Sequence, residues 1–302
     1  MKLHIEAPAT TANLACGFDV LGLALDLTYR VEVETLKERR FLLTHEGEGE
    51  GEVPENEENL FFRAVQRTWE HLGFQGSGLR VKAQNGIPIA RGLGSSAACI
   101  AAGVTVANVL CGRKLGFEEM LKIAVTLEGH PDNVVPAFVG GFTIALAQGE
   151  STLYRKLPFI SSLYLYALIP DYTLSTEAMR RALPPSYGRD DVVFSLSHLA
   201  FLLGSLFEKD AEGFLRALED RIHEPYRGKH VVGFFEVKDY VKERGIGNAA
   251  ISGSGPTVLL FLLRPLEERE EREIGEIFSS CGVRVEIRRV HPREKGIEVV
   301  VE

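Results

Sequence analysis

The sequence predicts a protein of mixed helix and strand that folds as one large domain or as two closely packed ones. Strand-like and helix-like segments follow one another along all 302 residues, without an internal repeat or a low-complexity tract. Hydrophobic residues make up 45% of the chain and charged residues 25%, which are ordinary values for a globular protein. A chain of this length can bury a sizeable core, so disorder is not favoured.

The elements follow from hydrophobic periodicity and from glycine, proline and capping residues. Residues 8–20 are expected to form an ordered loop, and the acidic residues 46–58 an exposed one. Between the strands 143–147 and 163–169, a stretch with glycine and proline is the expected domain boundary. The remaining expected strands are 2–7, 29–34, 41–44, 78–83, 283–289 and 297–301, with a strand, a glycine-rich turn and a strand at 249–261. The expected helices are 60–72, 97–110, 117–127, one that begins at Ser175, 192–207, 210–218, 233–243 and 267–278.

Charge and cysteine content narrow the functional classes. The net charge of −8 argues against a general nucleic-acid surface, so a phosphate ligand must be held by local amides, a metal and a few arginines. The four cysteines form no Cys-x-x-Cys pair, so a zinc site is not predicted. Residues 1–6 lack a signal-peptide core, and no apolar run reaches membrane-spanning length. We expect a cytoplasmic protein with reduced thiols and with neither a nucleic-acid nor a membrane partner.

A glycine-rich stretch in the first third of the chain is the one around which the rest is organised. Pro88 stops a helix from running backwards, Gly92 and Gly94 permit backbone angles that a side chain would forbid, and Ser95 and Ser96 favour a helix start. We expect N–H groups to converge at the positive end of the following helix, which is a site for an anion such as phosphate. The P-loop lysine and the third glycine of a dinucleotide fingerprint are both missing. The alternative is an ordinary glycine-rich turn before a buried helix.

The complete string, Pro-x-x-x-Gly-Leu-Gly-Ser-Ser-Ala, resembles the nucleotide loop of the small-molecule kinase superfamily that includes galactokinase, homoserine kinase, mevalonate kinase and phosphomevalonate kinase. The resemblance implies that the loop binds ATP. It also places Asn59 near the adenine, although Asn is equally a good helix cap. The nucleotide-binding residues that it implies are Asn59, Pro88, Ile89, Ala90, Arg91, Gly92, Leu93, Gly94, Ser95, Ser96, Ala97 and Ala98.

The N-terminal segment 8–25 contains an amide and a carboxylate, Asn13 and Asp19. From spacing alone, both are most simply turn residues that bond their own backbone. The whole string, Pro-Ala-Thr-x-Ala-Asn-Leu-x-x-Gly-Phe-Asp-x-Leu-Gly-Leu-Ala-Leu, closely resembles the N-terminal signature of the homoserine kinase family, with small departures at Ala15 and Cys16. The resemblance implies that Asn13 and Asp19 contact the amino-acid substrate, and a carboxylate suits its ammonium group.

A second polar cluster, Glu128-Gly-His130-Pro-Asp132-Asn133, ends the helix expected at 117–127. Taken singly, these residues could be a turn histidine and helix caps. Together they resemble the Glu-Gly-His-x-Asp-Asn pattern of homoserine kinases. The resemblance implies that Glu128 and Ser96 hold Mg²⁺, which prefers oxygen ligands and keeps several waters. It also assigns His130 and Asn133 to the substrate site.

The second half of the chain contributes further residues to the same pattern. The segment from Ser175 meets a Ser-Thr-x-x-x-Arg-x-x-Leu-Pro pattern, which points to Thr176 and Arg180 as substrate contacts, with Arg181 as the neighbouring alternative. An arginine would bind a carboxylate with two parallel bonds or steady the transferring phosphoryl group. Arg227 lies in a Glu-Pro-x-Arg element of the family. Gly253 belongs to a stretch that spacing alone predicts to be a plain hairpin turn, and that also matches the third superfamily motif.

The resemblance covers nearly the whole chain and implies an α+β fold in two domains. The first, 1–157, resembles a ribosomal-protein-like βαβ layer that binds ATP; the second, 158–302, resembles a ferredoxin-like domain that completes the substrate site. The implied reaction is ATP-dependent phosphorylation of the hydroxyl of L-homoserine in threonine biosynthesis, with Mg²⁺ as cofactor. Whether the protein forms a homodimer stays open.

The family places Asn where related kinases have a catalytic Asp. Asn133 matches that position and cannot act as a base, so we expect no dedicated base and assign catalytic roles to Asn133 and Arg180. Asp132 is adjacent, and its part in proton transfer stays open. Two alternatives remain: another kinase of the superfamily, acting on a mevalonate-type or shikimate-type hydroxyl, and a catalytically silent ligand sensor.

Overall fold

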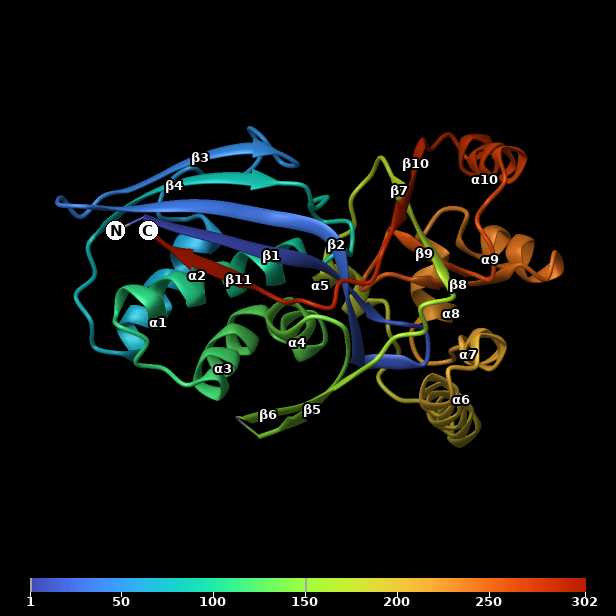
Figure 1. Ribbon diagram of the computed structural model, residues 1–302. Coiled ribbons are helices and arrows are strands. Elements are labelled where there is room, and N and C mark those ends of the chain that lie inside the picture. Colours follow the sequence, from blue (N-terminus) through green and yellow to red (C-terminus); the bar gives the residue numbers. More distant parts are fainter. Residues whose placement is uncertain (1, 150) are drawn as a thin grey trace.

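Two sheets, one in each half of the chain, organise the computed structural model (Figure 1), which describes residues 2–149 and 151–302. Met1 and Glu150, both inside the expected first domain, lie outside the described residues. The first half contains β1 (Lys2–Asn13), β2 (Gly17–Leu36), β3 (Phe41–Gly47), α1 (Leu60–His71), β4 (Gly78–Asn85), α2 (Ser95–Leu110), α3 (Phe117–Glu128), α4 (Pro131–Val139), β5 (Phe142–Gln148) and β6 (Ser151–Leu157). The second half contains β7 (Tyr164–Pro170), α5 (Thr176–Arg181), α6 (Arg189–Glu208), α7 (Ala211–Ala217), α8 (Glu224–Arg227), a 3₁₀ turn (Gly228–His230), α9 (Phe234–Glu243), β8 (Gly247–Ile251), β9 (Val258–Leu262), α10 (Glu268–Ser280), β10 (Val285–Val290) and β11 (Glu298–Val301).

The seven-stranded sheet has the order β11-β1-β2-β4-β3, with β5 paired to β2 and β6 to β5; the four-stranded sheet has the order β10-β7-β9-β8. Among these strands only β3 and β4 pair in parallel. Helices α1 to α4 cover one face of the first sheet (Figure 1). Because β11 pairs with β1, the last strand of the chain returns to the first sheet and brings the two termini together (Figure 1). We therefore propose a division near residue 158 in which β11 belongs to the first domain.

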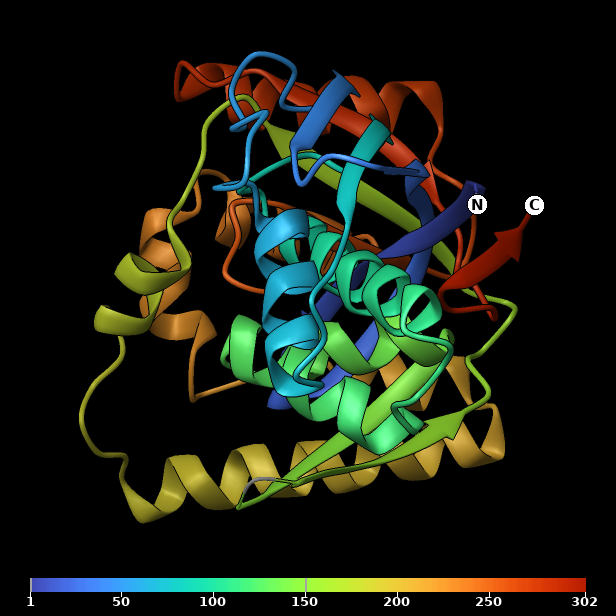
Figure 2. The ribbon, with the colours of Figure 1, turned by 90° about the vertical axis from the view of Figure 1, so that its left-hand side faces the viewer.

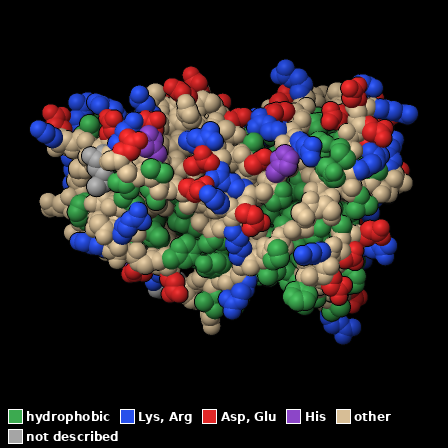
Figure 3. Space-filling view, in the orientation of Figure 1, with side chains coloured by type: hydrophobic (Ala, Val, Ile, Leu, Met, Phe, Trp, Pro, Cys, Tyr) green, Lys and Arg blue, Asp and Glu red, His purple; other side chains and the backbone are tan. Residues whose placement is uncertain are grey.

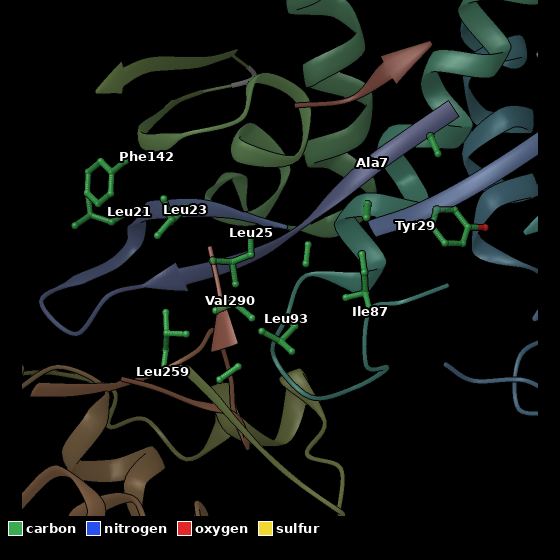
Figure 4. Packing of buried hydrophobic residues seen from close by; sticks show 14 of the residues in the cluster. Ala7, Leu21, Leu23, Leu25, Tyr29, Ile87, Leu93, Phe142, Leu259 and Val290 are labelled. Atoms are coloured by element: carbon green, nitrogen blue, oxygen red, sulfur yellow. The ribbon is translucent and has the colours of Figure 1, made fainter. Parts of the chain in front are cut away.

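One hydrophobic cluster continues from the first sheet into the second. Leu21, Leu23 and Leu25 of β2 lie in the same cluster as Leu259 of β9 and Val290 of β10 (Figure 4). All five side chains are at most 1% exposed, so separating the halves would expose a continuous apolar surface, which is unfavourable. The two halves are therefore held in a fixed relation, and so are the residues that they bring to a shared site.

Segments of the first half of the chain differ from the sequence-based expectation, among them residues 17–20, which were expected in a loop and begin β2, and residues 131–139, which form the unexpected helix α4. Residues 8–13, expected in a loop, continue β1, and every one of them is buried. Their small Ala and Thr side chains lack the alternation of a half-exposed strand, because this strand is covered on both faces. The expected domain boundary contains β6, an edge strand of alternating exposed and half-buried residues that pairs only with β5. Its polar side chains gave a weak strand signal.

Helix α6 corrects a further expectation. Among the described residues it is the one helix that is long and apolar enough, by length and composition, to cross a membrane, and 22% of its apolar window is buried. The helix expected from the sequence, 192–207, is shorter than α6 by the charged residues 189–191 at its start and Glu208 at its end. Its inner face carries Ser195 and Ser205, which are buried in the protein body, while its outer face is exposed.

Candidate active site

A cavity of about 370 Å³ is lined by segments from both halves of the chain. Three of the predicted site residues, Arg91, Ala97 and Ala98, do not line it. The predicted residues that do line it are Asn13, Asp19, Asn59, Pro88, Ile89, Ala90, Gly92, Leu93, Gly94, Ser95, Ser96, Glu128, His130, Asn133, Thr176, Arg180, Arg227 and Gly253.

The phosphate loop, residues 87–94, ends at the N-terminus of α2. Gly94 is the N-cap, with φ at 68°, and no side chain caps the helix. The helix starts at Ser95, two residues earlier than expected, so Ser95 and Ser96 occupy its first turn rather than its cap. The first N–H groups of a helix have no partner within the helix, and here no capping side chain takes their place. This leaves them for an anion at the positive end of α2.

The glycine-rich turn, residues 252–257, packs directly against the phosphate loop. Ser252 Oγ donates to the carbonyl oxygen of Gly92 at 2.6 Å, and the Thr257 N–H donates to that of Arg91 at 3.3 Å. A Cβ on Gly92 would lie 2.1 Å from the Ser252 carbonyl oxygen, and its φ is 76°. Only glycine fits there. The turn also joins β8 and β9 as a hairpin. It is therefore both a hairpin turn and a segment that packs against the phosphate loop.

Ser96 and Glu128 meet beside the phosphate loop. Ser96 Oγ donates to Glu128 Oε1 at 2.5 Å. Burial raises the pKa of the Glu128 carboxyl, against the effect of the Ser96 hydrogen bond. A partly desolvated carboxylate that accepts a hydrogen bond from a hydroxyl fits a cation as an additional partner, and two oxygen donors suit Mg²⁺, which keeps several waters. No group of three or more His, Cys, Asp or Glu within residues 2–149 and 151–302 could hold a metal by itself, so phosphate oxygens or water would complete the coordination.

The start of α4 forms a buried polar network. Asp132 Oδ1 lies 2.5 Å from His130 Nδ1 and accepts the N–H of Asn133 at 3.1 Å. Burial alone would lower the pKa of His130, but the hydrogen bond and the charge of Asp132 raise it. Asn133 Oδ1 accepts from Thr10 Oγ1 at 2.8 Å, which leaves the Asn133 amide nitrogen as the group that can donate to a ligand.

Asp19 and Arg180 form a two-bond ion pair across the cavity. Arg180 Nη1 and Nη2 donate to Asp19 Oδ2 and Oδ1, each at 3.0 Å. Both side chains remain more than a third exposed, so a ligand can reach them. Arg181 instead pairs with Glu177 on the exposed side of α5, which favours Arg180 as the arginine that faces the cavity.

The turn between β1 and β2 is held in an unusual conformation. Asn13, Leu14, Ala15 and Asp19 have φ between 45° and 75°, a region that non-glycine residues rarely adopt. Asn13 Nδ2 donates to the Gly253 carbonyl at 2.7 Å, and Asn13 Oδ1 accepts the Asp19 N–H at 3.0 Å. These bonds fix the direction of the Asp19 backbone from the second half of the chain.

Arg227 and His223 support this turn from α8 and its N-cap. Arg227 is 2% exposed and donates to the carbonyl oxygens of Gly253 and Met179. Burial lowers its pKa, and the nearby charge of Arg180 adds to the effect. His223 lies 2.9 Å through Nε2 from the carbonyl oxygen of Ala15. The predicted residues Asn13, Arg227 and Gly253 therefore bind one another at the wall of the cavity.

Family models match two segments of the chain: the GHMP kinases N terminal domain at residues 59–141 and the GHMP kinases C terminal at residues 202–281. A homoserine kinase of Moorella thermoacetica is 36% identical over 98% of this chain and 99% of its own length. The chain belongs to the homoserine kinase family. A further homoserine kinase, of Petrotoga mobilis, is 38% identical over 85% of this chain and 83% of its own length.

Solved structures agree with membership in the homoserine kinase family. The crystal structure of homoserine kinase from Cytophaga hutchinsonii superposes with a TM-score of 0.85 at 28% identity, over 99% of this chain and 97% of that one. A mevalonate kinase superposes with a TM-score of 0.68 at 15% identity, over 97% and 99%, which shows the shared fold. The expected α+β kinase fold is thus confirmed, and the chain is a member of an ATP-dependent kinase family.

In this member of the homoserine kinase family, Arg91 does not face the cavity. Its Nε donates to the Pro170 carbonyl at 2.9 Å and its Nη1 to that of Ile89 at 3.3 Å, so the side chain links the phosphate loop to β7. Ala97 and Ala98 are buried inside α2. A motif in sequence cannot distinguish residues that surround a ligand from those that hold the surrounding loop in place.

Sequence reasoning missed a group of lining residues. The sequence leaves a role for Asp132 open, and Ser254 lies in the third superfamily motif without an assigned role. Ser175 likewise heads the Ser-Thr-x-x-x-Arg-x-x-Leu-Pro pattern, in which only Thr176 and Arg180 are assigned to the substrate. The others are brought to the cavity from separate elements, and no local pattern distinguishes them from core or loop residues. The lining residues that were not predicted are Tyr29, His45, Val53, Pro54, Leu60, Asn85, Cys99, Asp132, Leu174, Ser175 and Ser254.

Proposed function

We propose that the protein transfers the γ-phosphoryl group of ATP to the side-chain hydroxyl of L-homoserine, giving O-phospho-L-homoserine in threonine biosynthesis. The observation that carries this proposal is the presence of one carboxylate and one guanidinium, Asp19 and Arg180, in the same cavity as an uncapped phosphate loop. An α-amino acid has one ammonium and one carboxylate, which match these two charges. The similar proteins, which are homoserine kinases, support this assignment.

The nucleotide is proposed to lie against the loop 87–94 and the first turn of α2. The N–H groups there favour the phosphates, and Mg²⁺, held by Ser96 and Glu128, would neutralise part of their charge. Asn59 does cap α1, because its Oδ1 accepts the Phe61 N–H at 2.9 Å. It also lines the cavity, so a contact with the adenine stays a prediction.

The acceptor is proposed to separate the ion pair of Asp19 and Arg180. The substrate ammonium would take the place of the guanidinium beside Asp19, and the substrate carboxylate would take the place of Asp19 beside Arg180. One ion pair is thereby exchanged for two, each a charge-assisted contact. Thr176, whose Oγ1 lies 3.3 Å from Ser254 Oγ, supplies a hydroxyl at the same wall. The amino-acid end is thus fixed while the side-chain hydroxyl points toward the phosphate loop.

Proton transfer is proposed to need no dedicated base. Asn133 stands beside the cavity and cannot accept a proton at neutral pH. Asp132 is 2% exposed, and one of its oxygens already contacts His130 and the Asn133 N–H. The hydroxyl proton would pass to a phosphate oxygen or to water. Placement and charge neutralisation supply most of the acceleration in phosphoryl transfer. The Asn133 amide is the donor offered to the reacting groups, and Arg180 contributes by fixing the amino-acid end of the substrate.

The experiment that tests the proposed substrate is a panel measured by ADP release. L-Homoserine, mevalonate and shikimate are compared at equal concentration with saturating ATP and Mg²⁺. The expected result is a kcat/KM for homoserine at least about a hundredfold above the other two, because only homoserine carries both charges. Mevalonate turning over faster than homoserine would overturn the assignment, and binding of ATP and homoserine without ADP release would indicate a ligand sensor.

A further inference from the structure

One group of residues that line the cavity takes no part in the phosphate, metal and acceptor contacts described above. We call this group the base wall. None of its members carries a carboxylate, an ammonium or a guanidinium, and most are apolar, which suits a flat, neutral ring system. The base wall consists of Tyr29, His45, Val53, Pro54, Asn59, Leu60, Asn85 and Cys99.

The base wall is where one phosphoryl donor can be distinguished from another. Ribonucleoside triphosphates share the same phosphates and the same ribose, so their charge does not separate them. Figure 3 shows acidic and basic side chains interspersed over the face that it draws, so the surface there provides no field of a single sign to steer a ligand. Selection among these nucleotides therefore depends on the polar atoms that the base meets inside the cavity.

Both amide side chains of the base wall hold the chain's own backbone. Asn85 Nδ2 donates to the carbonyl oxygens of Glu48 and Ile87, at 2.9 and 3.1 Å. Asn59 Nδ2 donates to the Pro54 carbonyl oxygen at 2.8 Å, and its Oδ1 caps α1. These bonds anchor the loop 48–59, which Figure 2 shows descending from β3 near the top of the view to α1. The two amides are thus oriented by the loop and the helix start rather than by a ligand.

His45 of β3 offers an acceptor that the chain itself does not use. The side chain is 6% exposed, and its Nε2 lies 2.8 Å from the Glu48 carbonyl oxygen. A carbonyl oxygen only accepts, so Nε2 carries the hydrogen and donates it, and Nδ1 of the neutral ring is an acceptor. Within residues 2–149 and 151–302, the buried Nδ1 has no hydrogen-bond partner. An unpaired buried acceptor is unfavourable, and a donor on a ligand would relieve this cost.

We propose that His45 makes the cavity selective for adenine by accepting a hydrogen bond at Nδ1 from the exocyclic amino group of the base. The inference rests on the proposed function, because it requires ATP to bind in this cavity. Adenine carries an amino donor at C6, whereas guanine and hypoxanthine carry a carbonyl oxygen there. The lone pairs of that oxygen would face the lone pair of Nδ1. His45 therefore favours ATP over GTP and ITP as the phosphoryl donor, and it acts on binding of the nucleotide rather than on the transfer step.

The test compares the Kd of three nucleotides, measured by titration calorimetry with Mg²⁺ and without homoserine. These are ATP, purine riboside triphosphate, which lacks the amino group, and ITP, which has an oxygen in its place. The wild-type protein should bind ATP about tenfold more tightly than purine riboside triphosphate, and should bind ITP more weakly still. A Kd for ITP equal to or below that for ATP would overturn this inference alone. Absence of binding by all three nucleotides would overturn the proposed function as well.

Two variants separate the Nδ1 acceptor from the bond that anchors the loop. His45→Gln places an amide nitrogen near the position of Nε2, so it keeps a donor for the Glu48 carbonyl oxygen and loses the acceptor. His45→Asn places an oxygen near the position of Nδ1, so it keeps the acceptor and loses the donor. The preference for ATP over purine riboside triphosphate should fall below about twofold in His45→Gln and stay above about fivefold in His45→Asn.

Each preference is a ratio of two Kd values on the same variant, so a general loss of affinity or stability cancels. An equal loss of preference in both variants would mean that His45 acts only by holding the loop, and would overturn the proposal. So would a preference for ATP that persists unchanged in His45→Gln, because the acceptor at Nδ1 is then not the group that selects the base.

Discussion

Asp19 and Arg180 are 161 residues apart in sequence and share two hydrogen bonds of 3.0 Å in the cavity. Each is held from a different direction, Asp19 by the turn after β1 and Arg180 by α5. The pair keeps two opposite charges at a fixed separation in the absence of a ligand, which suits a zwitterion better than a substrate with carboxylate alone. We therefore expect these two residues to set the choice of substrate.

Asp19→Ala tests the ammonium contact. The kcat/KM for L-homoserine should fall about a hundredfold, because a charge-assisted contact is lost. The kcat/KM for 4-hydroxybutanoate, which lacks the ammonium group, should change less than about threefold. The measurement is initial-rate ADP release with both substrates. Arg181→Ala, next to the cavity arginine but paired with Glu177 on the surface, is the control that should leave both values unchanged. Equal losses for both substrates would count against the assigned role of Asp19.

Asp132 and Asn133 decide whether the reaction uses a base. Asp132→Asn keeps the shape of the buried side chain and removes its basicity, so kcat should fall less than about tenfold. Asn133→Ala removes a donor offered to the reacting groups and should lower kcat by about tenfold to a hundredfold. Single-turnover rates with homoserine measure both. A selective thousandfold loss in an intact Asp132→Asn or Asp132→Ala variant would refute the mechanism without a base.

At the scale of elements, the site is assembled where helices and strands end. Two helix caps could be predicted from the sequence, because Asn59 and Ser175 each accept the N–H of a residue in the first turn that follows. Asp210, expected as the first residue of a helix, is instead the cap of α7. The phosphate loop could be predicted as well. Gly92 and Gly94 have a positive φ, which favours glycine over other residues, so the glycines in the sequence indicate the loop. The strand through residues 8–13 could not be predicted. Its Ala and Thr residues show no alternation of apolar and polar side chains, because both faces of this strand are buried.

Gly92→Ala tests the packing of the glycine-rich turn on the phosphate loop. The new Cβ would lie 2.1 Å from a backbone oxygen, so the loop or the turn must move. We expect ATP affinity to fall more than about tenfold, measured by titration calorimetry without homoserine. Gly112→Ala is the matched control, because its φ is 81° but a Cβ there would meet nothing within 4 Å. Equal effects in both variants would mean that backbone strain alone, rather than the contact, is responsible.

Lys238 of α9 joins three elements beside the site. Its Nζ lies 2.9 Å from Glu224 of α8, and Glu224 Oε1 accepts the N–H of Ile251 in β8. Burial alone would lower the pKa of Lys238, but the carboxylates of Glu224 and Glu219 raise it above 10.5. Because the pKa of Lys238 is higher in the folded than in the unfolded protein, its charge stabilises the fold fully at a pH below the unfolded-state pKa. This stabilisation is lost as the pH rises through the folded-state pKa.

Lys238→Met should lower the free energy of unfolding by about 3–5 kcal/mol at neutral pH, because it leaves Glu224 buried and unpaired. The difference from the wild type should stay constant between about pH 7 and 9 and shrink above about 10.5. Urea denaturation measures both. Lys242→Met, which removes a half-exposed partner of Glu219, should cost less than about 1 kcal/mol. A difference that grows at alkaline pH would contradict the direction of the shift.

At the scale of the whole molecule, two sheets share one core and one cavity. The family motifs predicted which segments take part, and the geometry brings eighteen of the predicted residues to the cavity wall. Periodicity and turn residues did not reveal that β11 returns to β1 or that Tyr29 and His45 line the site, because these contacts join residues that no local pattern connects. Nor did they reveal the exposed outer face of α6, since exposure depends on what the rest of the fold covers.

The most direct test of the account is phosphorus NMR of the purified protein with ATP, Mg²⁺ and L-homoserine. The account predicts that ADP and O-phospho-L-homoserine appear together in equal amounts, and that D-homoserine, whose ammonium and carboxylate exchange positions relative to Asp19 and Arg180, reacts at least about a hundredfold more slowly. ADP with free phosphate and no phosphohomoserine, or no turnover at all, would contradict it.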